Sequence, residues 1–350
     1  MHILSEPVVS GIFRSLTQKQ CHQFLDVLGK GLIAYSAESK PGVLDSQKLI
    51  HQPLRTVFTT KDDNSCIFMP VSDTSSSAVK VVTVSQAGIQ GTINIFSPDG
   101  RLRGLLAAAE VTAFRTALAS MTLFARCASL RKANIVVMGS GRQAEWHARL
   151  ALLLYPDQIQ RLTFINRGRK RLDEMEAGVF ADLRQRYPQL NLTSFAKEGS
   201  ADYEQRLRQD LGDSDVIFSC TPSVEPNFGF EVLQARPKQR FISLIGSYKP
   251  HMHEIDTETL LSGGGKVYVD SKAACLEEAG ELITAKLTEG DLIEMGDLLG
   301  SMGSDEPIQI PDGQNVIYKC VGMGLMDLVV GKTLLDIGEE QNVGTHVDGF

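Results

Sequence analysis

The stretch that decides the fold is Ala133-Asn-Ile-Val-Val-Met-Gly139-Ser-Gly141-Arg-Gln-Ala144-Glu-Trp-His-Ala-Arg-Leu150. It reads as a buried strand, a glycine-rich turn and a helix, and its small residues fit the pattern G-x-G-x-x-A. Gly139 permits the tight turn, Gly141 lets the backbone approach a pyrophosphate, and Ala144 lets the helix pack on the strand. The amino end of the helix faces the anion, so we predict dinucleotide contacts from Gly139, Ser140, Gly141, Arg142 and Gln143. The alternative is a glycine turn in an α/β protein that binds no dinucleotide.

After this turn the chain alternates between apolar strands and helical stretches. We expect strands at 135–138, 162–165, 216–219, 241–245 and 267–269, with helices that include 145–154 and 170–187. Such alternation builds right-handed βαβ units and a parallel sheet with helices on both faces. The sequence therefore predicts a Rossmann doubly wound α/β domain over residues 131–314.

The end of the second predicted strand bears on the choice of cofactor. It reads Phe164-Ile-Asn-Arg-Gly-Arg-Lys-Arg171, with no acid for a ribose 2′-hydroxyl and with four cations. Arginine supplies the charge-assisted hydrogen bonds that a 2′-phosphate needs. We predict that NADP(H) is preferred over NAD(H), with contacts from Asn166, Arg167 and Arg169. The alternative is a solvated basic helix start, which also fits Lys170 and Arg171.

The residues before the glycine turn predict a second domain of α+β type. Residues 17–37 show helical spacing behind a capping Thr17, short strands fill 41–108, and a long alanine-rich helix covers 110–130. We expect residues 316–330 to be helical and to return to this domain. The domain is then discontinuous and comprises residues 1–130 plus 315–350.

Three basic residues interrupt apolar stretches of this domain. Lys80 lies in Ser77-Ala-Val-Lys-Val-Val-Thr-Val84, Arg115 lies in the long helix, and Arg55 opens a strand. Because a buried cation is costly unless it is paired, we predict that the three share an anion. The α-carboxylate of an amino or imino acid would serve. The alternative is a set of salt bridges to local acids such as Glu110.

Composition argues against several classes of protein. The 350-residue chain has a formal net charge of -7, which does not favour nucleic-acid binding. Its six scattered cysteines include no C-x-x-C pair and suit a reducing compartment, so we expect a cytoplasmic protein. We see no signal peptide and no apolar run of membrane-spanning length.

Two further groups of residues receive less weight. His251, His253 and Glu254 resemble metal ligands, but no second cluster completes a site, so we expect a solvated loop and no metal. Trp146 and His147 follow the glycine turn on the predicted helix, and we expect both to be packing residues.

Several stretches, in order from about residue 68 to Asp327, resemble the ornithine cyclodeaminase/mu-crystallin family. They are Ala78-Val-Lys-Val-Val-Thr83, Val111-Thr-Ala-Phe-Arg-Thr-Ala-Leu-Ala-Ser120, Met138-Gly-Ser-Gly-Arg-Gln-Ala144, Ile165-Asn-Arg167, Leu244-Ile-Gly-Ser-Tyr-Lys-Pro250 with Glu254-Ile-Asp256, Glu278-Ala-Gly-Glu281, and Lys319-Cys-Val-Gly-Met-Gly-Leu-Met-Asp-Leu328. The resemblance implies a homodimer whose substrate domain is built from both chain ends.

The resemblance also implies roles for individual residues. Arg55, Lys80 and Arg115 match the positions that hold the substrate carboxylate, and Lys80 is the catalytic residue close to the reacting carbon. Met69 is implied as a further substrate contact, and Thr221 and Ser247 as further cofactor contacts.

One position departs from part of the family, because Tyr248 stands where ornithine cyclodeaminases carry an aspartate. Without that carboxylate, a ketimine reductase is the favoured interpretation. It would transfer hydride from NADPH to C2 of a cyclic imino acid, such as piperideine- or pyrroline-2-carboxylate. The alternatives are an ornithine cyclodeaminase with bound NAD, an opine-type or other amino-acid dehydrogenase, and a non-catalytic NADPH-binding protein.

Overall fold

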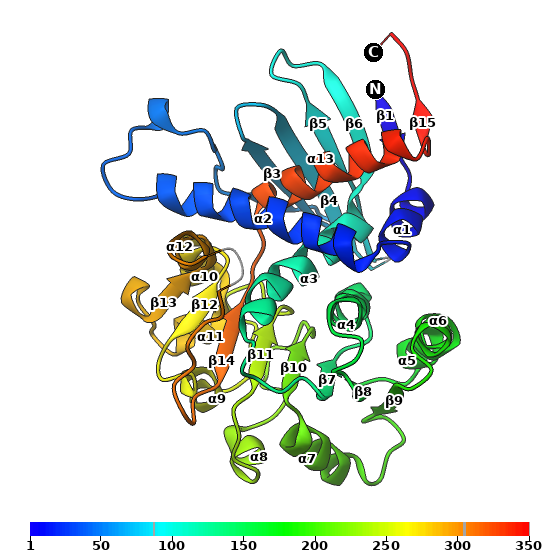
Figure 1. Cartoon of the computed structure of the whole chain (residues 1–350), viewed down its shortest axis with the longest axis vertical. Helices are drawn as coiled ribbons and strands as arrows, with labels where there is room; N and C mark the ends of the chain where they lie inside the picture. Colours follow the sequence, from blue (N-terminus) through cyan, green and yellow to red (C-terminus); the bar gives the residue numbers. More distant parts are fainter. Residues whose placement is uncertain (87, 304–305, 350) are drawn as a thin grey trace. The chain divides into compact units, whose positions relative to one another are not determined.

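The computed structural model describes residues 1–86, 88–303 and 306–349. It divides into two compact units, of which unit 1 comprises Met1–Thr116 with Gly322–Phe350 and unit 2 comprises Ala117–Val321. The first cut falls inside helix α3 (Ala108–Arg126), which begins in unit 1 and ends in unit 2. The domain boundaries predicted from the sequence lie after residues 130 and 314 instead. Each unit has its own sheet (Figure 1).

Unit 2 is built on a parallel sheet. Over the described residues its strand order is β13-β12-β14-β11-β10-β7-β8-β9, and all of these strand pairs are parallel. The strands are β7 (Asn134–Met138), β8 (Arg161–Asn166), β9 (Asn191–Ala196), β10 (Val216–Ser219), β11 (Phe241–Leu244), β12 (Val267–Val269), β13 (Leu292–Glu294) and β14 (Val316–Lys319). The helices are α4 (Arg142–Leu154), α5 (Lys170–Met175), η2 (Glu176–Phe180), α6 (Ala181–Arg186), α7 (Tyr203–Asp213), α8 (Phe230–Gln234), α9 (Thr257–Leu261), α10 (Lys272–Glu278), α11 (Gly280–Thr284), η3 (Glu289–Asp291) and α12 (Met295–Ser301). The predicted doubly wound α/β fold is confirmed.

The central strands of unit 2 form because their residues are apolar on both faces. Ile217, Ile242 and Ile317 lie side by side in register on three neighbouring strands and are fully buried. Helices that cover both faces of a parallel sheet favour such continuous apolar runs.

Three strands of unit 2, β9, β13 and β14, are absent from the sequence prediction. The helix predicted over 316–330 is wrong at its start, because Val316–Lys319 forms β14 and pairs with β11 and β12. A short apolar run has no periodicity that separates a strand from a helix, so the neighbouring strands decide. Strand β9 is half polar in sequence, and it too has no periodicity from which a strand could be predicted.

The strand order of unit 2 creates a crevice. From β7 the chain moves to β8 and β9 on one side, and then crosses to β10 and β11 on the other. The turns after β7 and β10 therefore diverge at the carboxyl edge of the sheet, where open α/β sheets bind their ligands.

Unit 1 holds a mixed sheet with the order β15-β1-β6-β5-β4-β3-β2 among its described residues. The strands β2 to β6 form an antiparallel series, and β1 pairs in parallel with β6. Their bounds are β1 (His2–Leu4), β2 (Thr56–Thr59), β3 (Ser65–Ser72), β4 (Ser77–Ser85), β5 (Gly88–Phe96), β6 (Leu102–Ala107) and β15 (Thr345–His346). Both ends of the chain thus enter one sheet (Figure 1).

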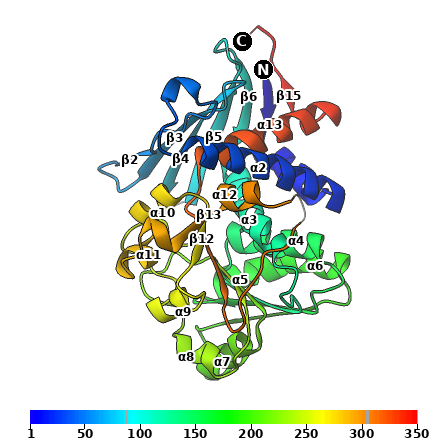
Figure 2. The same ribbon diagram turned by 60° about the vertical axis from the view of Figure 1, so that its left-hand side comes forward.

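The helices of unit 1 are α1 (Glu6–Arg14), α2 (Gln18–Glu38), η1 (Asp45–Gln47) and α13 (Gly324–Glu340), together with the start of α3. Helices α1 and α13 pack on the sheet, and α2 packs on α13 (Figure 2). Gly331 of α13 lies against Ile95 of the sheet, and Gly31 of α2 lies against Val329 of α13. The predicted Thr17 cap of α2 is confirmed, because its side chain accepts a hydrogen bond from Gln20 N at 3.3 Å.

Candidate functional site

The glycine turn joins β7 to α4, and its two glycines are required for different reasons. Gly139 has a φ of +114°, and a Cβ there would lie 2.9 Å from the carbonyl oxygen of Cys220, so no other residue fits well. Gly141 is the N-cap of α4, and a Cβ added to it would meet nothing within 4 Å. The amino end of α4 therefore faces open space that can receive a phosphate group.

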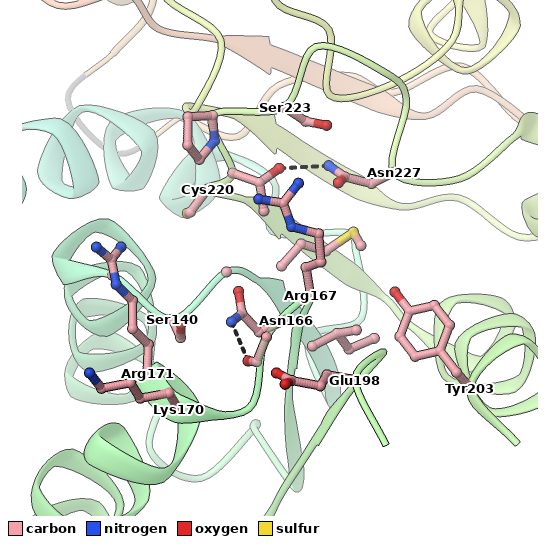
Figure 3. A pocket seen from close by; sticks show the side chains of 17 residues that line it. Ser140, Asn166, Arg167, Lys170, Arg171, Glu198, Tyr203, Cys220, Ser223 and Asn227 are labelled. Atoms are coloured by element: carbon pink, nitrogen blue, oxygen red, sulfur yellow. Dashed lines mark hydrogen bonds between the residues drawn. The ribbon is translucent and has the colours of Figure 1, made fainter. Parts of the chain in front are cut away.

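A cavity of about 540 Å³ lies at the crevice of unit 2 (Figure 3). That volume is within the usual range for small-molecule sites. Turns from the carboxyl ends of β7, β8, β9 and β10 line it. Of the predicted cofactor contacts, Gly139, Ser140, Gly141, Asn166, Arg167 and Thr221 are lining residues. Arg142 and Gln143 form the first turn of α4 and are not among the lining residues.

The basic residues after β8 separate into two groups. Arg167, Lys170 and Arg171 line the cavity, and within the described part of the chain none of their side chains forms an ion pair. Arg169 does not line it, because its guanidinium is held by Asp173 at 2.5 Å and Glu176 at 2.9 Å. The cations available to a ligand are thus Arg167, Lys170 and Arg171, and the last two also fit a solvated helix start by sequence.

An acid that sequence reasoning missed also lines the cavity. Glu198 follows β9, and its Oε2 accepts a hydrogen bond from Arg169 N at 2.8 Å. Neighbouring parallel strands end at the same edge of a sheet, so a correct prediction of β9 would have brought this residue to the turn after β8.

A buried carboxylate orders the loops that follow β10 and β11. Glu254 is fully buried, and it accepts hydrogen bonds from Ser219 Oγ at 2.7 Å, Thr221 N at 2.9 Å and Gly246 N at 2.6 Å. Burial is the main cause that raises its pKa to about 7. The prediction of a solvated loop is therefore wrong for this residue. Glu254 instead holds the backbone of Thr221, which lines the cavity.

Ser247 lies in a second buried cluster and not on the cavity wall. Its Oγ donates a hydrogen bond to Glu281 at 2.5 Å, and its carbonyl accepts one from the buried Nζ of Lys319. His251 is exposed, while His253 contacts Thr284 through Nε2 at 2.7 Å. Within the described residues no cluster of three or more histidine, cysteine or acidic side chains could hold a metal ion.

Trp146 and His147 are buried, as expected of packing residues. His147 Nε2 lies 2.8 Å from Ser120 Oγ, which superficially resembles an activated nucleophile. Both side chains are fully buried, however, and burial lowers the pKa of His147 to about 4. A serine without access to a substrate cannot act as a nucleophile, so this pair contributes to packing.

In unit 1, two of the predicted substrate-binding residues meet at one carboxylate. Lys80 Nζ lies 2.6 Å from Asp327 Oδ2, and Arg115 Nε lies 3.2 Å from Asp327 Oδ1. All three side chains are at most 4% exposed. Burial is the main cause that lowers the pKa of Lys80 to about 8, although Asp327 opposes the shift. Asp327 is therefore an acid shared by Lys80 and Arg115, and in the sequence it stood out only as part of the family resemblance.

Arg55 and Met69 adjoin the same cluster. Arg55 donates a hydrogen bond to the carbonyl of Gly322 at 2.8 Å. A Cβ on Gly322, whose φ is +87°, would lie 2.3 Å from the guanidinium of Arg115. Met69 pairs with Lys80 in the β3–β4 register and is buried. The three cations and Asp327 together carry a formal charge of +2.

No family model matches this chain, but its sequence is similar to those of several known proteins. An uncharacterized protein of Saccharomyces cerevisiae is 30% identical over 328 residues, covering 80% of this chain and 83% of that protein. A Delta(1)-pyrroline-2-carboxylate reductase of Bacillus cereus is 26% identical over 312 residues, with 85% and 89% covered. The ketimine reductase mu-crystallin of Macropus fuliginosus is 24% identical over 327 residues, with 89% and 91% covered. The chain belongs to the ornithine cyclodeaminase/mu-crystallin family.

A solved structure agrees with this membership at the level of the fold. The Delta(1)-pyrroline-2-carboxylate reductase of Thermococcus litoralis, in complex with NADH and L-proline, matches with a TM-score of 0.79 and 20% identity. The match covers 99% of this chain and 100% of that one. Among the described residues no helix of this family member has both the length and the apolar character needed to cross a membrane.

Proposed function

We propose that this protein is an NADPH-dependent reductase of cyclic imino acids, which it converts to cyclic amino acids. Family membership carries the coarser statement, that it is an NAD(P)-dependent oxidoreductase acting on C=N bonds. The observation that carries the finer one is the buried cluster of Lys80, Arg115 and Asp327, in which cations exceed carboxylates.

The charge of the cluster supports a substrate with one carboxylate. Lys80 and Arg115 both pair with Asp327, and the half-buried Arg55 adjoins them through its hydrogen bond to the Gly322 carbonyl. Buried charges are stable only when they are compensated, so an anionic ligand is favoured. An imino acid such as piperideine-2-carboxylate or pyrroline-2-carboxylate provides that anion next to its C=N carbon.

The chain's own residues then supply the proton that the reaction needs. A reduced nicotinamide, when bound, supplies the hydride that forms the new C2–H bond while it is itself oxidised. Lys80 donates a proton from Nζ to the imine nitrogen, which leaves a secondary amine. Its pKa of about 8 suits a donor near neutral pH, because the group is protonated there and yet gives up its proton readily. Asp327 and Arg115 position Lys80 and the substrate carboxylate.

The lining of the cavity in unit 2 supports a dinucleotide site. Gly139 and Gly141 leave room for a pyrophosphate at the amino end of α4. Arg167, Lys170 and Arg171 line the same cavity and have no ion pair within the described residues, which supports NADP(H) over NAD(H).

The test is the loss of absorbance at the nicotinamide band when purified protein is mixed with freshly generated piperideine-2-carboxylate and NADPH, repeated with NADH. We expect rapid oxidation of NADPH and formation of pipecolate. Lys80→Ala should abolish turnover and leave NADPH binding intact, whereas Lys48→Ala, at a lysine paired with Asp45 at the surface, should change neither. Unchanged activity in Lys80→Ala would overturn the assignment of the proton donor. No oxidation of either cofactor would overturn the reductase itself and would lead to an assay of ammonia release from ornithine.

We also propose that the protein is a homodimer and that it resides in the cytoplasm. Leu54, Val57, Phe58 and Ile89 of unit 1 expose 65%, 50%, 49% and 49% of their surfaces, and such apolar groups favour an interface between copies. None of the six cysteines, all of which the structure describes, forms a disulfide, which suits a reducing compartment. Light scattering should give the mass of a dimer, and Phe58→Glu should weaken it.

A further inference from the structure

The turn after β8 carries no acid of its own, but the neighbouring turn after β9 brings one, Glu198, to the same cavity. The end of β8 carries Asn166 and Arg167, whereas proteins that prefer NAD commonly place an acid there for the ribose 2′-hydroxyl. Strand β9 runs parallel to β8, and Glu198 follows it by two residues. The Glu198 backbone N donates to Arg167 O at 3.0 Å, and its Oε2 accepts from Arg169 N at 2.8 Å. In Figure 3 this carboxylate points toward the turn that follows β8.

We propose that Glu198 is a specificity-determining residue that limits the preference for NADP(H) over NAD(H). Its carboxylate accepts a hydrogen bond from the ribose 2′-hydroxyl of NAD(H) and repels the 2′-phosphate of NADP(H). The inference rests on the proposed dinucleotide site and deepens it, because the same cavity then holds determinants for both cofactors.

The charges at this end of the cavity support that assignment. Arg167, Lys170 and Arg171 attract a 2′-phosphate, and Glu198 opposes them from the wall formed by the turn after β9. No lysine or arginine in the described ranges forms an ion pair with Glu198, so its charge is not cancelled by a partner. The Glu198 carboxylate and a 2′-phosphate repel each other. For exposed charges about 6 Å apart, removing such a repulsion strengthens binding of the phosphate-bearing ligand roughly three- to tenfold.

The experiment compares Glu198→Gln with the wild-type protein. Glutamine has nearly the same shape, and its Oε1 still accepts the hydrogen bond from Arg169 N, so the turn is kept. Dissociation constants for NADPH and NADH are measured by fluorescence, and those for 2′,5′-ADP and 5′-AMP by calorimetry. We expect the ratio of affinities to move toward NADPH and 2′,5′-ADP by about three- to tenfold, and the change to shrink as salt is added.

Glu174→Gln is the matched control, because it removes the same charge from an exposed position on α5 outside the cavity lining. It should leave the ratio unchanged. An unchanged ratio in Glu198→Gln, or a move toward NADH, would overturn the role of Glu198 and leave the reductase standing. Failure of the wild-type protein to bind either cofactor would overturn both. These binding measurements need no imino acid, so a negative turnover assay does not decide them.

Discussion

Replacing Asp327 with Asn removes one negative charge from the centre of unit 1. Lys80 Nζ lies 2.6 Å from this carboxylate and Arg115 Nε lies 3.2 Å from it, and neither cation is more than 4% exposed. Breaking a buried pair leaves an uncompensated charge, at a cost of about 3–5 kcal/mol. For a domain of this size that corresponds to a fall of roughly 6–20 °C in Tm.

Scanning calorimetry is the suitable assay, because the single tryptophan, Trp146, lies in unit 2 and its fluorescence would not report on unit 1. Asp45→Asn is the control, since Asp45 pairs with Lys48 at 2.7 Å on the surface of the same unit. The control should shift Tm far less, because water screens an exposed pair. If Asp327→Asn cost less than about 1 kcal/mol, the claim that Asp327 stabilises the buried charges of Lys80 and Arg115 would be refuted.

Three further predictions follow from the site. The rate of imine reduction should fall above about pH 8, because Lys80 loses its proton there. Asp327 raises the pKa of Lys80, so Asp327→Asn should move this decline to lower pH. Measuring the rate against pH for both proteins tests the two expectations. Burial raises the pKa of Glu254 from 4.5 to about 7. Between these pH values the folded protein binds more protons than the unfolded chain, so its stability falls as pH rises. The urea midpoint should decrease over this pH range in the wild-type protein and not in Glu254→Gln. Gly141→Ala should weaken NADPH binding at unchanged Tm, because its Cβ meets only open space, whereas Gly139→Ala should also lower Tm because of its positive φ and the nearby Cys220 carbonyl.

Much of unit 2 could be predicted because local patterns decide it. Gly139 has a positive φ that few other residues adopt, and the strands β7, β10 and β11 are mostly apolar runs, which are typical of buried strands. Strand β14 could not be predicted, because the run Val316–Lys319 is short and only its neighbours β11 and β12 make it a strand. A four-residue apolar segment carries no period of its own.

Sequence alone determined the dinucleotide turn, the basic residues after β8 and the three cations of unit 1, since each depends on residue type and short spacing. Only the tertiary structure decided which partners they meet. Asp327 reaches Lys80 from the far end of the chain, and Glu198 reaches the turn at Arg169 from the next strand. Arg169, predicted to contact the cofactor, pairs with acids one and two turns along its helix. The physical reason is that charges interact according to distance in space, and a chain's fold sets that distance independently of separation in sequence.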